Sequence, residues 1–562
     1  MRTALCISVV LGALGAARAN ADIRQVRFLP AETMDLTAVG TIDWCVYRVT
    51  DAPKPTFAAA DFMKGGEGVG RKIAVRGTIH IPTRQERAAR QAAELRKIDY
   101  LKLATDFADC MLEHGRDHYG REHTPLFAVL LLREDPPRIG PQPVFASPAR
   151  YDWQKKMENP FRRFDYNRCL NYPAGLGDEG PHKVTLYGCD VYEDADLYTM
   201  LIDLTRITGA ATYKAEAERA LTWWFTHTIG PADLYPWGEH LGWDFENECP
   251  TYFEGPSKHL YAACYHEIKD TVPFLDHLAA LPAAGDEERT PLERYALGVW
   301  KAHYWDPDRA IYCRHGDYTG KDDRTGGLAG FPAHQGAHLR LWVKAYLTTK
   351  DDLLKQRFAD ILTKVLDVQT ARAKTYGFIP FTFDPDVKGK KAKRSGQSDR
   401  LAHHAAELSV ITKQDAPDLS AKLHELAKVL LGEQGFADAV GKVERFRATG
   451  DRGYLRGAYD SRTKPAARVA DLSKAETPAE HAREIVRRLR WYRQHEDEAY
   501  LRAAEQQARI AYVQFCDETC PLPKAYAGEP RRSVDGKPFP DFYFRGAKLM
   551  HAFALFGEAM RE

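Results

Sequence analysis

A short pattern that recurs four times constrains the fold of this chain more than any other feature of its sequence. In each copy one amphipathic stretch ends, a tight polar turn follows, and a second amphipathic stretch begins. The copies are Leu204–Ala217, Tyr346–Phe358, Val410–Leu423 and Tyr492–Ala504. Apolar residues at three- to four-residue spacing indicate helices, and short turns make successive helices antiparallel. Because one helical hairpin cannot bury its apolar stripe alone, four of them predict a helical array.

The spacing between the copies indicates which kind of array they form. Solenoid proteins stack repeats of fixed length, whereas here long inserts of unequal length separate the hairpins. Irregular hairpins that carry long inserts favour a closed ring. The sequence therefore predicts a mainly α chain, an (α/α) toroid or barrel of helical hairpins over residues 97–562. We expect the inserts to form a cleft at one end of the ring.

The first 96 residues differ from the rest. Residues 1–21 have a basic start, an apolar run over Ala4–Ala17 and an Ala19-Asn20-Ala21 exit, which is the pattern of a cleavable secretory signal peptide. Residues 22–96 contain short alternating stretches separated by Gly and Pro, which predict a small β-rich element. No stretch has the roughly 20 apolar residues that a membrane helix needs. We expect a periplasmic or secreted protein without a membrane span.

Charge and cysteine content narrow the function classes. The chain has 79 Lys+Arg against 78 Asp+Glu, a balance that excludes a generic nucleic-acid binder. Loss of the signal peptide would leave nine cysteines, an odd number. Cys516 and Cys520 are spaced to close a small loop, and Cys169 and Cys189 flank a Gly- and Pro-rich stretch. The sequence is consistent with disulfide bonds and with buried free cysteines, and it does not decide between them.

Three inserts concentrate the residue types that carry chemistry. Residues 113–126, 235–246 and 304–340 are dense in His, Trp, Tyr, Arg and acidic side chains. Their motifs are Tyr119-Gly120-x-x-His123-Thr124-Pro125-Leu126-Phe127, Pro236-Trp237-Gly238-Glu239-His240-x-x-Trp243-Asp244-Phe245 and Phe331-Pro332-x-His334-x-Gly336. Together they resemble exported bacterial (α/α)-toroid proteins that act on polysaccharides, in particular toroid lyases of the alginate and glucuronan type. One position departs from the family pattern, because Ala333 stands where a basic residue is expected to bind uronate carboxylates.

The resemblance implies β-elimination on a uronic-acid polysaccharide. This reaction removes the proton α to a uronate carboxylate, so it needs a base, an acid for the leaving oxygen and donors that neutralise the carboxylate. As catalytic residues we expect His240, Tyr318 and His334, with Glu239 orienting His240. The expected substrate-binding residues are Arg116, His123, Trp237, Trp243, Asp244, Arg314, His338 and Arg340.

Other interpretations stay open beside the lyase. Metal-ligand spacing occurs at His334 and His338, but without the glutamate of a His-Glu-x-x-His motif. No metal or other cofactor is therefore predicted, although a structural divalent metal is not excluded. An inverting glycoside hydrolase would use two carboxylates roughly 6.5–9.5 Å apart, and the candidates for such a pair are Asp117, Glu239, Asp244 and Glu246.

A third interpretation is a non-catalytic glycan-binding protein, which the Ala333 departure supports. The basic loop from Lys388 to Arg394 and the pair His403-His404 have ordinary interpretations, a solvated loop and a helix-face pair. The expected partner in every case is an anionic polysaccharide, with no nucleic acid. The sequence predicts no oligomeric state.

Overall fold

The computed structural model divides the chain into two compact units. One comprises Met1–Lys97 with Asp471–Ala475, and the other comprises Ile98–Ala470 with Glu476–Glu562. The residues that the structure describes are 34–35, 78–79, 89, 92, 98–139, 172–173, 188–192, 194–230, 233–236, 241–245, 248–252, 265–266, 272–284, 288–306, 311–312, 332–380, 397–449, 466–470, 472, 477–525, 527, 541–544 and 546–561.

Little of the first unit falls within these residues. Strand β1 (Met34–Asp35) pairs antiparallel with β2 (Thr78–Ile79), with Met34 opposite Ile79. Both strands lie within residues 22–96, the segment predicted as a small β-rich element. The signal peptide predicted for residues 1–21 lies outside the described residues, and the domain boundaries at 21 and 96 stay predictions.

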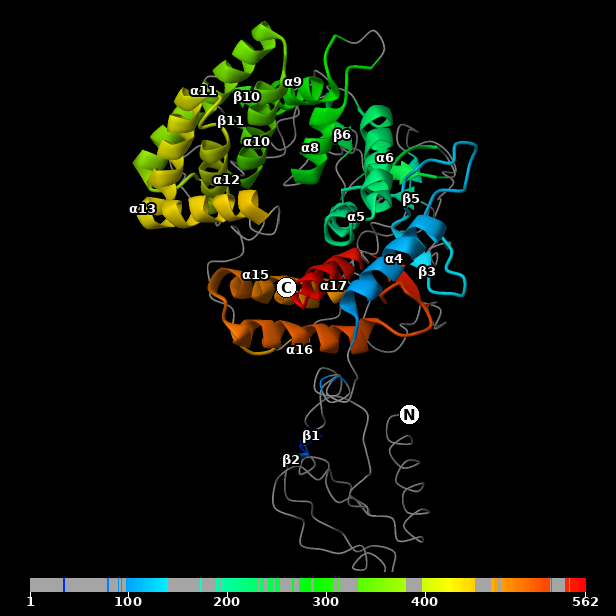
Figure 1. Ribbon diagram of the computed structural model, residues 1–562. Helices are drawn as coiled ribbons and strands as arrows, with labels where there is room; N and C mark the ends of the chain where they lie inside the picture. Colours follow the sequence, from blue (N-terminus) through cyan, green and yellow to red (C-terminus); the bar gives the residue numbers. More distant parts are fainter. Residues whose placement is uncertain are drawn as a thin grey trace, which may run out of the picture. The chain divides into compact units, whose positions relative to one another are not determined.

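The second unit contains the four predicted hairpins (Figure 1). In order they are α5 (Ala195–Thr208) with α6 (Ala211–His227), α10 (Pro332–Thr348) with α11 (Asp352–Tyr376), α12 (Gln397–Ile411) with α13 (Pro417–Thr449), and α15 (Pro478–His495) with α16 (Glu498–Phe515). Turn residues account for where the helices stop and start. Gly209 ends α5 at φ 79°, a left-handed conformation that glycine adopts without strain. The Asp351 carboxylate caps α11 by accepting from Leu353 N and Leu354 N, at 2.8 and 3.0 Å.

Two further helix pairs were not predicted as hairpins. Helix α8 (Val272–Ala280) packs against α9 (Pro291–His303), which begins with a capping box between Thr290 and Glu293. Helix α17 (Ala547–Ala559) packs against α4 (Tyr100–His114), so the two ends of the helical region form one pair. This contact is close, because a Cβ at Gly557 would lie 2.8 Å from Leu101 N.

Contacts between helices run round a closed circuit. Each link joins neighbouring pairs, five of them through two side chains and one through a backbone carbonyl. They are Asp203 of α5 with His551 of α17, Glu558 of α17 with Arg493 of α15, the backbone carbonyl of Gln494 of α15 with Arg445 of α13, Glu407 of α12 with Arg340 of α10, Lys344 of α10 with Asp276 of α8, and His277 of α8 with Thr222 of α6. Since α6 is the hairpin partner of α5, the circuit returns to its start. The fold is the predicted mainly α toroid rather than an open superhelix.

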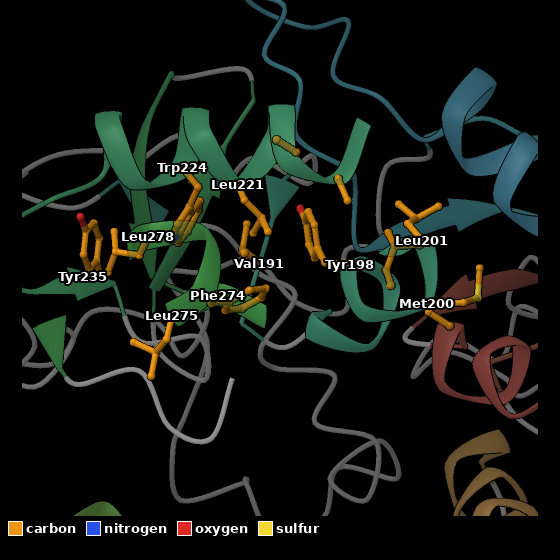
Figure 2. Packing of buried hydrophobic residues seen from close by; sticks show 14 of the residues in the cluster. Val191, Tyr198, Met200, Leu201, Leu221, Trp224, Tyr235, Phe274, Leu275 and Leu278 are labelled. Carbon is orange, nitrogen blue, oxygen red and sulfur yellow. The ribbon is translucent and has the colours of Figure 1, made fainter. Parts of the chain in front are cut away.

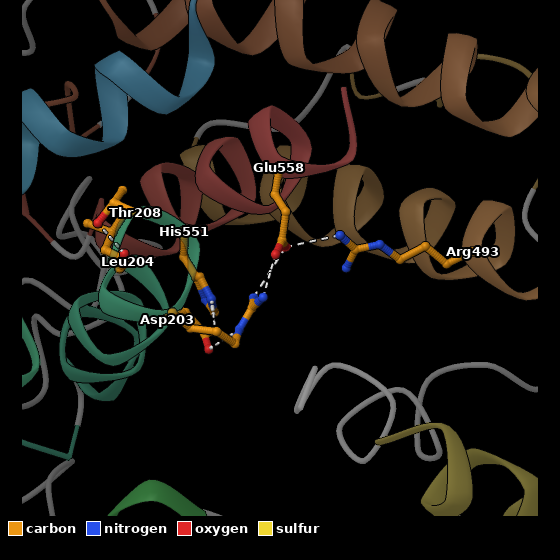
Figure 3. A network of polar contacts seen from close by, with 7 residues as sticks. Asp203, Leu204, Thr208, Arg493, His551 and Glu558 are labelled. Atoms are coloured by element: carbon orange, nitrogen blue, oxygen red, sulfur yellow. Dashed lines mark hydrogen bonds and ion pairs between the residues drawn. The ribbon is translucent and has the colours of Figure 1, made fainter. Parts of the chain in front are cut away.

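Figure 3 shows the part of this circuit that joins α5, α17 and α15. His551 Nε2 lies 2.7 Å from Asp203 Oδ2, with both side chains buried. The Glu558 carboxylate accepts a hydrogen bond from Arg493 Nη2 at 3.0 Å and also forms an ion pair with Arg206. Ion pairs near both ends, Lys548 with Asp196 and Arg206 with Glu558, show that α5 and α17 run parallel.

The other first helices of the pairs share this direction. Gly336 faces Leu401 and His404, near the starts of α10 and α12, and Arg340 pairs with Glu407 further along both helices. Helices α12 and α15 also run in the same direction, because α13 contacts the last turn of each. Arg447 donates to Val410 O of α12, and Arg445 donates to Gln494 O of α15.

Because these first helices run parallel, their N-terminal ends lie at the same end of the ring. We call it the insert end: it carries the starts of α5, α10, α12, α15 and α17.

Helix α13 departs from a simple hairpin. Its Gly432 has φ 73°, outside the helical region, so one continuous helical pattern is two helices joined at a kink. The second part folds back on the first, since the rings of His424 and Phe436 lie 4.3 Å apart. This fold-back lets Arg445 and Arg447 contact the ends of α15 and α12.

The core near the insert end is one continuous cluster of aliphatic and aromatic side chains (Figure 2). Tyr198 of α5, Phe225 of α6 and Phe274 of α8 pack edge to face, with ring centroids 5.9 and 6.1 Å apart. Interlocked rings of this kind add to the free energy gained by burying apolar surface. They give the inserts above them a rigid base.

Short strands in the inserts were not predicted. The strands β3 (Leu130–Leu132) and β12 (Phe542–Phe544) pair antiparallel, and a four-stranded sheet has the order β4-β8-β7-β5. Its strands are β4 (Tyr172–Pro173), β5 (Gly188–Cys189), β7 (Leu241–Asp244) and β8 (Cys249–Tyr252); the two remaining pairs are β6 (Tyr235–Pro236) with β9 (Tyr265–His266) and β10 (Tyr304–Asp306) with β11 (Ile311–Tyr312).

Cysteine chemistry does not close the loop after α16. Cys516 and Cys520 are free thiols, so the disulfide suggested by their spacing is absent, and Cys189 is free as well. Instead an ion pair holds the loop in place, because Arg133 Nη2 lies 3.0 Å from Asp517 Oδ1. Within the described residues, no helix combines the length and the apolar character needed to cross a membrane.

Candidate active site

The first insert forms an ordered loop, Arg116–Thr124, which we call the 116–124 loop. Arg116 starts the loop and is half-buried: its guanidinium donates to Pro125 O and to Glu216, and its Cζ lies 4.3 Å from the centre of the Phe127 ring. The charge of Arg116 is therefore compensated by Glu216. His123, near the other end of the loop, is exposed.

Asp117 organises this loop from inside. Its carboxylate is buried and accepts from Tyr119 N, Thr124 N and Thr124 Oγ1, at 3.0, 3.0 and 2.8 Å. Burial raises the pKa of Asp117, and the three hydrogen bonds oppose that shift. A carboxylate with its lone pairs used in this way shapes the turn, and it is poorly placed to act as the acid or base of a hydrolase.

The second insert reaches the same place through the β7–β8 hairpin. Glu248, in the turn of this hairpin, accepts from Glu122 N at 2.7 Å and from Arg121 N, so the first and second inserts meet. Asp244 ends β7, where its backbone pairs with Gly188. Trp237, Glu239, His240 and Glu246 lie outside the described residues, and their roles stay predictions.

Trp243 occupies a different environment from the one expected of a sugar-stacking residue. It is 7% exposed, and its ring packs edge-on against Trp223 with centroids 4.9 Å apart. In turn the Trp223 ring stacks on His227, with centroids 4.5 Å apart and planes 4° from parallel. Trp243 is thus part of the packing beneath the second insert, and its indole offers no open face.

The third insert leads into α10, whose first two turns carry His334 and His338. Both imidazoles are buried, as is Ala333, the position that departs from the family pattern. His338 Nδ1 lies 2.9 Å from Tyr304 Oη, and the Tyr304 ring also contacts Trp342, with centroids 5.2 Å apart. Both histidines lie near the start of one helix, as expected, and their functional roles stay predictions. Arg314 and Tyr318 lie outside the described residues.

Arg340, predicted to bind substrate, lies in a buried ion pair with Glu407 of α12. The side chains are 7% and 8% exposed. The Arg340 guanidinium, which was expected to bind a substrate carboxylate, is thus already paired with the carboxylate of Glu407. Gln335 of α10 similarly accepts from Gln369 Nε2 of α11, so both residues join α10 to its neighbours.

Tyr304 stands at the start of an insert without a pattern that indicates its role, and no sequence pattern singles out Glu407, Glu248 or Gln369. Nothing in their local sequence marks them, because each acts through a partner more than 30 positions away.

The pair His403-His404 lies where α12 meets its neighbours. Burial, the nearby Lys442 and His404 lower the pKa of His403 to about 4. His404 fills the space at Gly336, where a Cβ would lie 2.4 Å from its Cδ2. Both histidines are therefore in packed surroundings, as the helix-face interpretation expects. The basic loop from Lys388 to Arg394 lies outside the described residues.

Metal binding has no visible basis in the part of the chain that the structure describes. No group of three or more His, Cys, Asp or Glu side chains there could hold a metal ion. The expectation that no cofactor is needed stays a prediction.

Comparison with known protein families gives a match over part of the chain. Residues 193–331 match the family described as periplasmic pectate lyase. This segment begins just before α5 and ends just before α10, so it contains Glu239, His240, Arg314 and Tyr318. The match supports a carbohydrate-active enzyme of the polysaccharide lyase kind.

Similar solved structures include an unsaturated glucuronyl hydrolase specific for heparin, with 13% identity, a TM-score of 0.30, and coverage of 71% of this chain and 94% of that chain. The cellobiose 2-epimerase from Bacillus thermoamylovorans has 11% identity, a TM-score of 0.29, and coverage of 66% and 88%. The cellobiose 2-epimerase from Spirochaeta thermophila has 16% identity, a TM-score of 0.28, and coverage of 66% and 86%. The fold described above rests on the helix contacts of this chain.

Proposed function

We propose that this protein is an exported polysaccharide lyase that cleaves a uronic-acid-containing polysaccharide by β-elimination. The observation that carries the proposal is the pectate lyase match over residues 193–331. That segment supplies the insert with Glu239 and His240 and most of the insert that leads into α10. Export is supported by the signal-peptide pattern of residues 1–21 and by the periplasmic description of the matched family.

The chemistry assigns one task to each group. A base, His240 or Tyr318, removes the proton α to the uronate carboxylate. The electron pair of that C–H bond forms the new double bond, the glycosidic C–O bond breaks, and the leaving oxygen takes up a proton from an acid. Cationic or imidazole donors, including His334, stabilise the negative charge that develops on the carboxylate.

The described geometry refines this assignment. Because Arg116 and Arg340 are already paired with Glu216 and Glu407, we assign carboxylate binding first to Arg314. The pair Tyr304–His338 is buried, and we assign it to holding α10 in place below His334. Glu239 then orients His240 and increases its basicity.

The test is to incubate the mature protein with polygalacturonate, alginate, glucuronan and glycosaminoglycans and to follow the ultraviolet absorbance of unsaturated uronate. We expect absorbance to rise with at least one of these polymers. His240→Ala should reduce turnover by roughly 10²–10⁴-fold, the usual effect of losing a general base or acid, while the melting temperature stays unchanged. Glu239→Gln should give a smaller loss.

Two other results would overturn the proposal. New reducing ends without unsaturated product, with activity lost in Glu239→Gln and Asp244→Asn but kept in His240→Ala, would identify a hydrolase. Binding of a polymer without any turnover would identify a glycan-binding protein.

A further inference from the structure

The 116–124 loop is held in one conformation by a residue from another insert. Glu248 Oε1 accepts hydrogen bonds from the backbone N–H groups of Arg121 and Glu122. These two bonds lower the pKa of Glu248, so its carboxylate stays charged where the loop needs an acceptor. Glu248 itself has φ 54°, an unusual conformation for a residue other than glycine, in the turn of the β7–β8 hairpin.

Gly120 allows this contact to form. Its φ is +63°, and a Cβ at this position would lie 2.4 Å from Glu248 Oε1 and 2.7 Å from Phe245 O. Any larger residue would be strained at this φ and would push the hairpin turn away from the loop. Asp117 holds the loop from its buried side through three hydrogen bonds. The loop is therefore braced on two sides before any ligand binds.

Of the four side chains that the loop exposes, three suit an anionic sugar, and the fourth is the acidic Glu122. His118, Arg121 and His123 are exposed. The His118 ring stacks on Tyr119, with centroids 4.4 Å apart and planes 29° apart, and so gives the loop a flat ring surface. The carboxylates of Asp117 and Glu248 lie close enough to His123 to interact with it electrostatically. A guanidinium beside imidazoles binds carboxylates well, and rings offer a face to a sugar.

We propose that the 116–124 loop is a uronate-binding subsite for the polymer and that Glu248 is its positioning residue. This inference rests on the proposed function, because it assumes that the substrate carries uronates. The loop contacts the hairpin at Phe245, while His240 immediately precedes Leu241 at the other end of β7. Four residues of extended strand separate Leu241 and Phe245, which is roughly 13 Å. The subsite therefore binds a sugar unit away from the bond that is broken.

This position determines the kinetic signature. Loss of the subsite should weaken binding of long chains and leave the chemical step unchanged. Removal of two backbone hydrogen bonds in Glu248→Ala should raise KM for the polymer roughly ten-fold, with kcat within about two-fold of the parent. Glu248→Gln keeps an acceptor oxygen and should retain most of the affinity. Arg121→Ala, which removes only an exposed side chain, should raise KM similarly without changing the melting temperature.

The experiment measures both turnover and equilibrium binding of polygalacturonate and alginate by the full-length mature protein. The control is Glu433→Ala, which removes a carboxylate that is 81% exposed on α13. Binding measured without turnover separates the two proposals: a protein that never produces unsaturated product but loses polymer binding in Arg121→Ala refutes the lyase and supports the subsite. Unchanged KM and unchanged binding in both Arg121→Ala and Glu248→Ala would overturn the subsite, even with full lyase activity.

Discussion

The buried ion pair between Arg340 and Glu407 gives the sharpest test of how the ring is held together. It joins α10 to α12, and its two side chains are 7% and 8% exposed. Removing one partner leaves a charge that water does not solvate, and a broken buried pair of this kind typically costs about 3–5 kcal/mol. We therefore expect Glu407→Gln to lower the free energy of unfolding by an amount in this range.

The assay is urea denaturation followed by tryptophan fluorescence, since Trp342 lies on the same helix as Arg340. The matched control is Lys374–Glu425, which joins α11 to α13 with N and O atoms 2.6 Å apart but is 59% and 51% exposed. Glu425→Gln should cost less than about 1 kcal/mol, because water solvates an exposed charge that has lost its partner.

A double variant completes the cycle. Replacing both Arg340 and Glu407 by apolar residues, Arg340→Met with Glu407→Leu, should restore most of the stability, because neither charge is then buried alone. A Glu407→Gln variant as stable as the parent would refute the reasoning. So would a double variant less stable than Glu407→Gln.

Two other predictions follow from buried groups. Burial lowers the pKa of His481 to about 4, against about 6.5 in the unfolded chain, so the folded protein disfavours the proton. Stability from this group is complete above about pH 6.5 and is lost as the pH falls towards 4, by on the order of 3 kcal/mol, and His481→Gln should flatten that part of a stability–pH profile. Gly336→Ala should lower the free energy of unfolding by about 1–3 kcal/mol, because its Cβ would lie 2.4 Å from His404 Cδ2, whereas Gly441→Ala, with open space at its Cβ, should not.

Local sequence predicted the hairpins because their signals are local. Gly209, Asp351 and Asp497 interrupt a 3.6-residue pattern at the point where the chain turns, and each serves as a cap in the structure. Local sequence does not predict the fold-back of α13, because the residues on both sides of Gly432 keep a helical pattern. It does not predict the pairing of α4 with α17 either, because the two helices are more than 400 residues apart in sequence.

The sequence singles out candidate residues along the chain but does not indicate which of them are already bound to other groups of the protein. An Arg in a His-rich segment is expected to bind an anion, but whether its charge is available depends on partners such as Glu407 and Glu216, 67 and 100 residues away. For the same reason Trp243 matched a sugar-stacking pattern, while Trp223 and the core beneath it determine that the ring is buried. The insert strands have as few as two residues, too short to show alternation, and pairing alone defines them.

Product analysis in water labelled with heavy oxygen tests the central claim most directly. Elimination breaks the glycosidic C–O bond without adding water, whereas hydrolysis places a solvent oxygen in one product. With a polymer that the protein degrades, we expect mass spectrometry to show unsaturated uronate ends and no heavy oxygen in the product formed at the cleaved bond. Saturated products carrying one solvent oxygen per cleavage would contradict the lyase assignment.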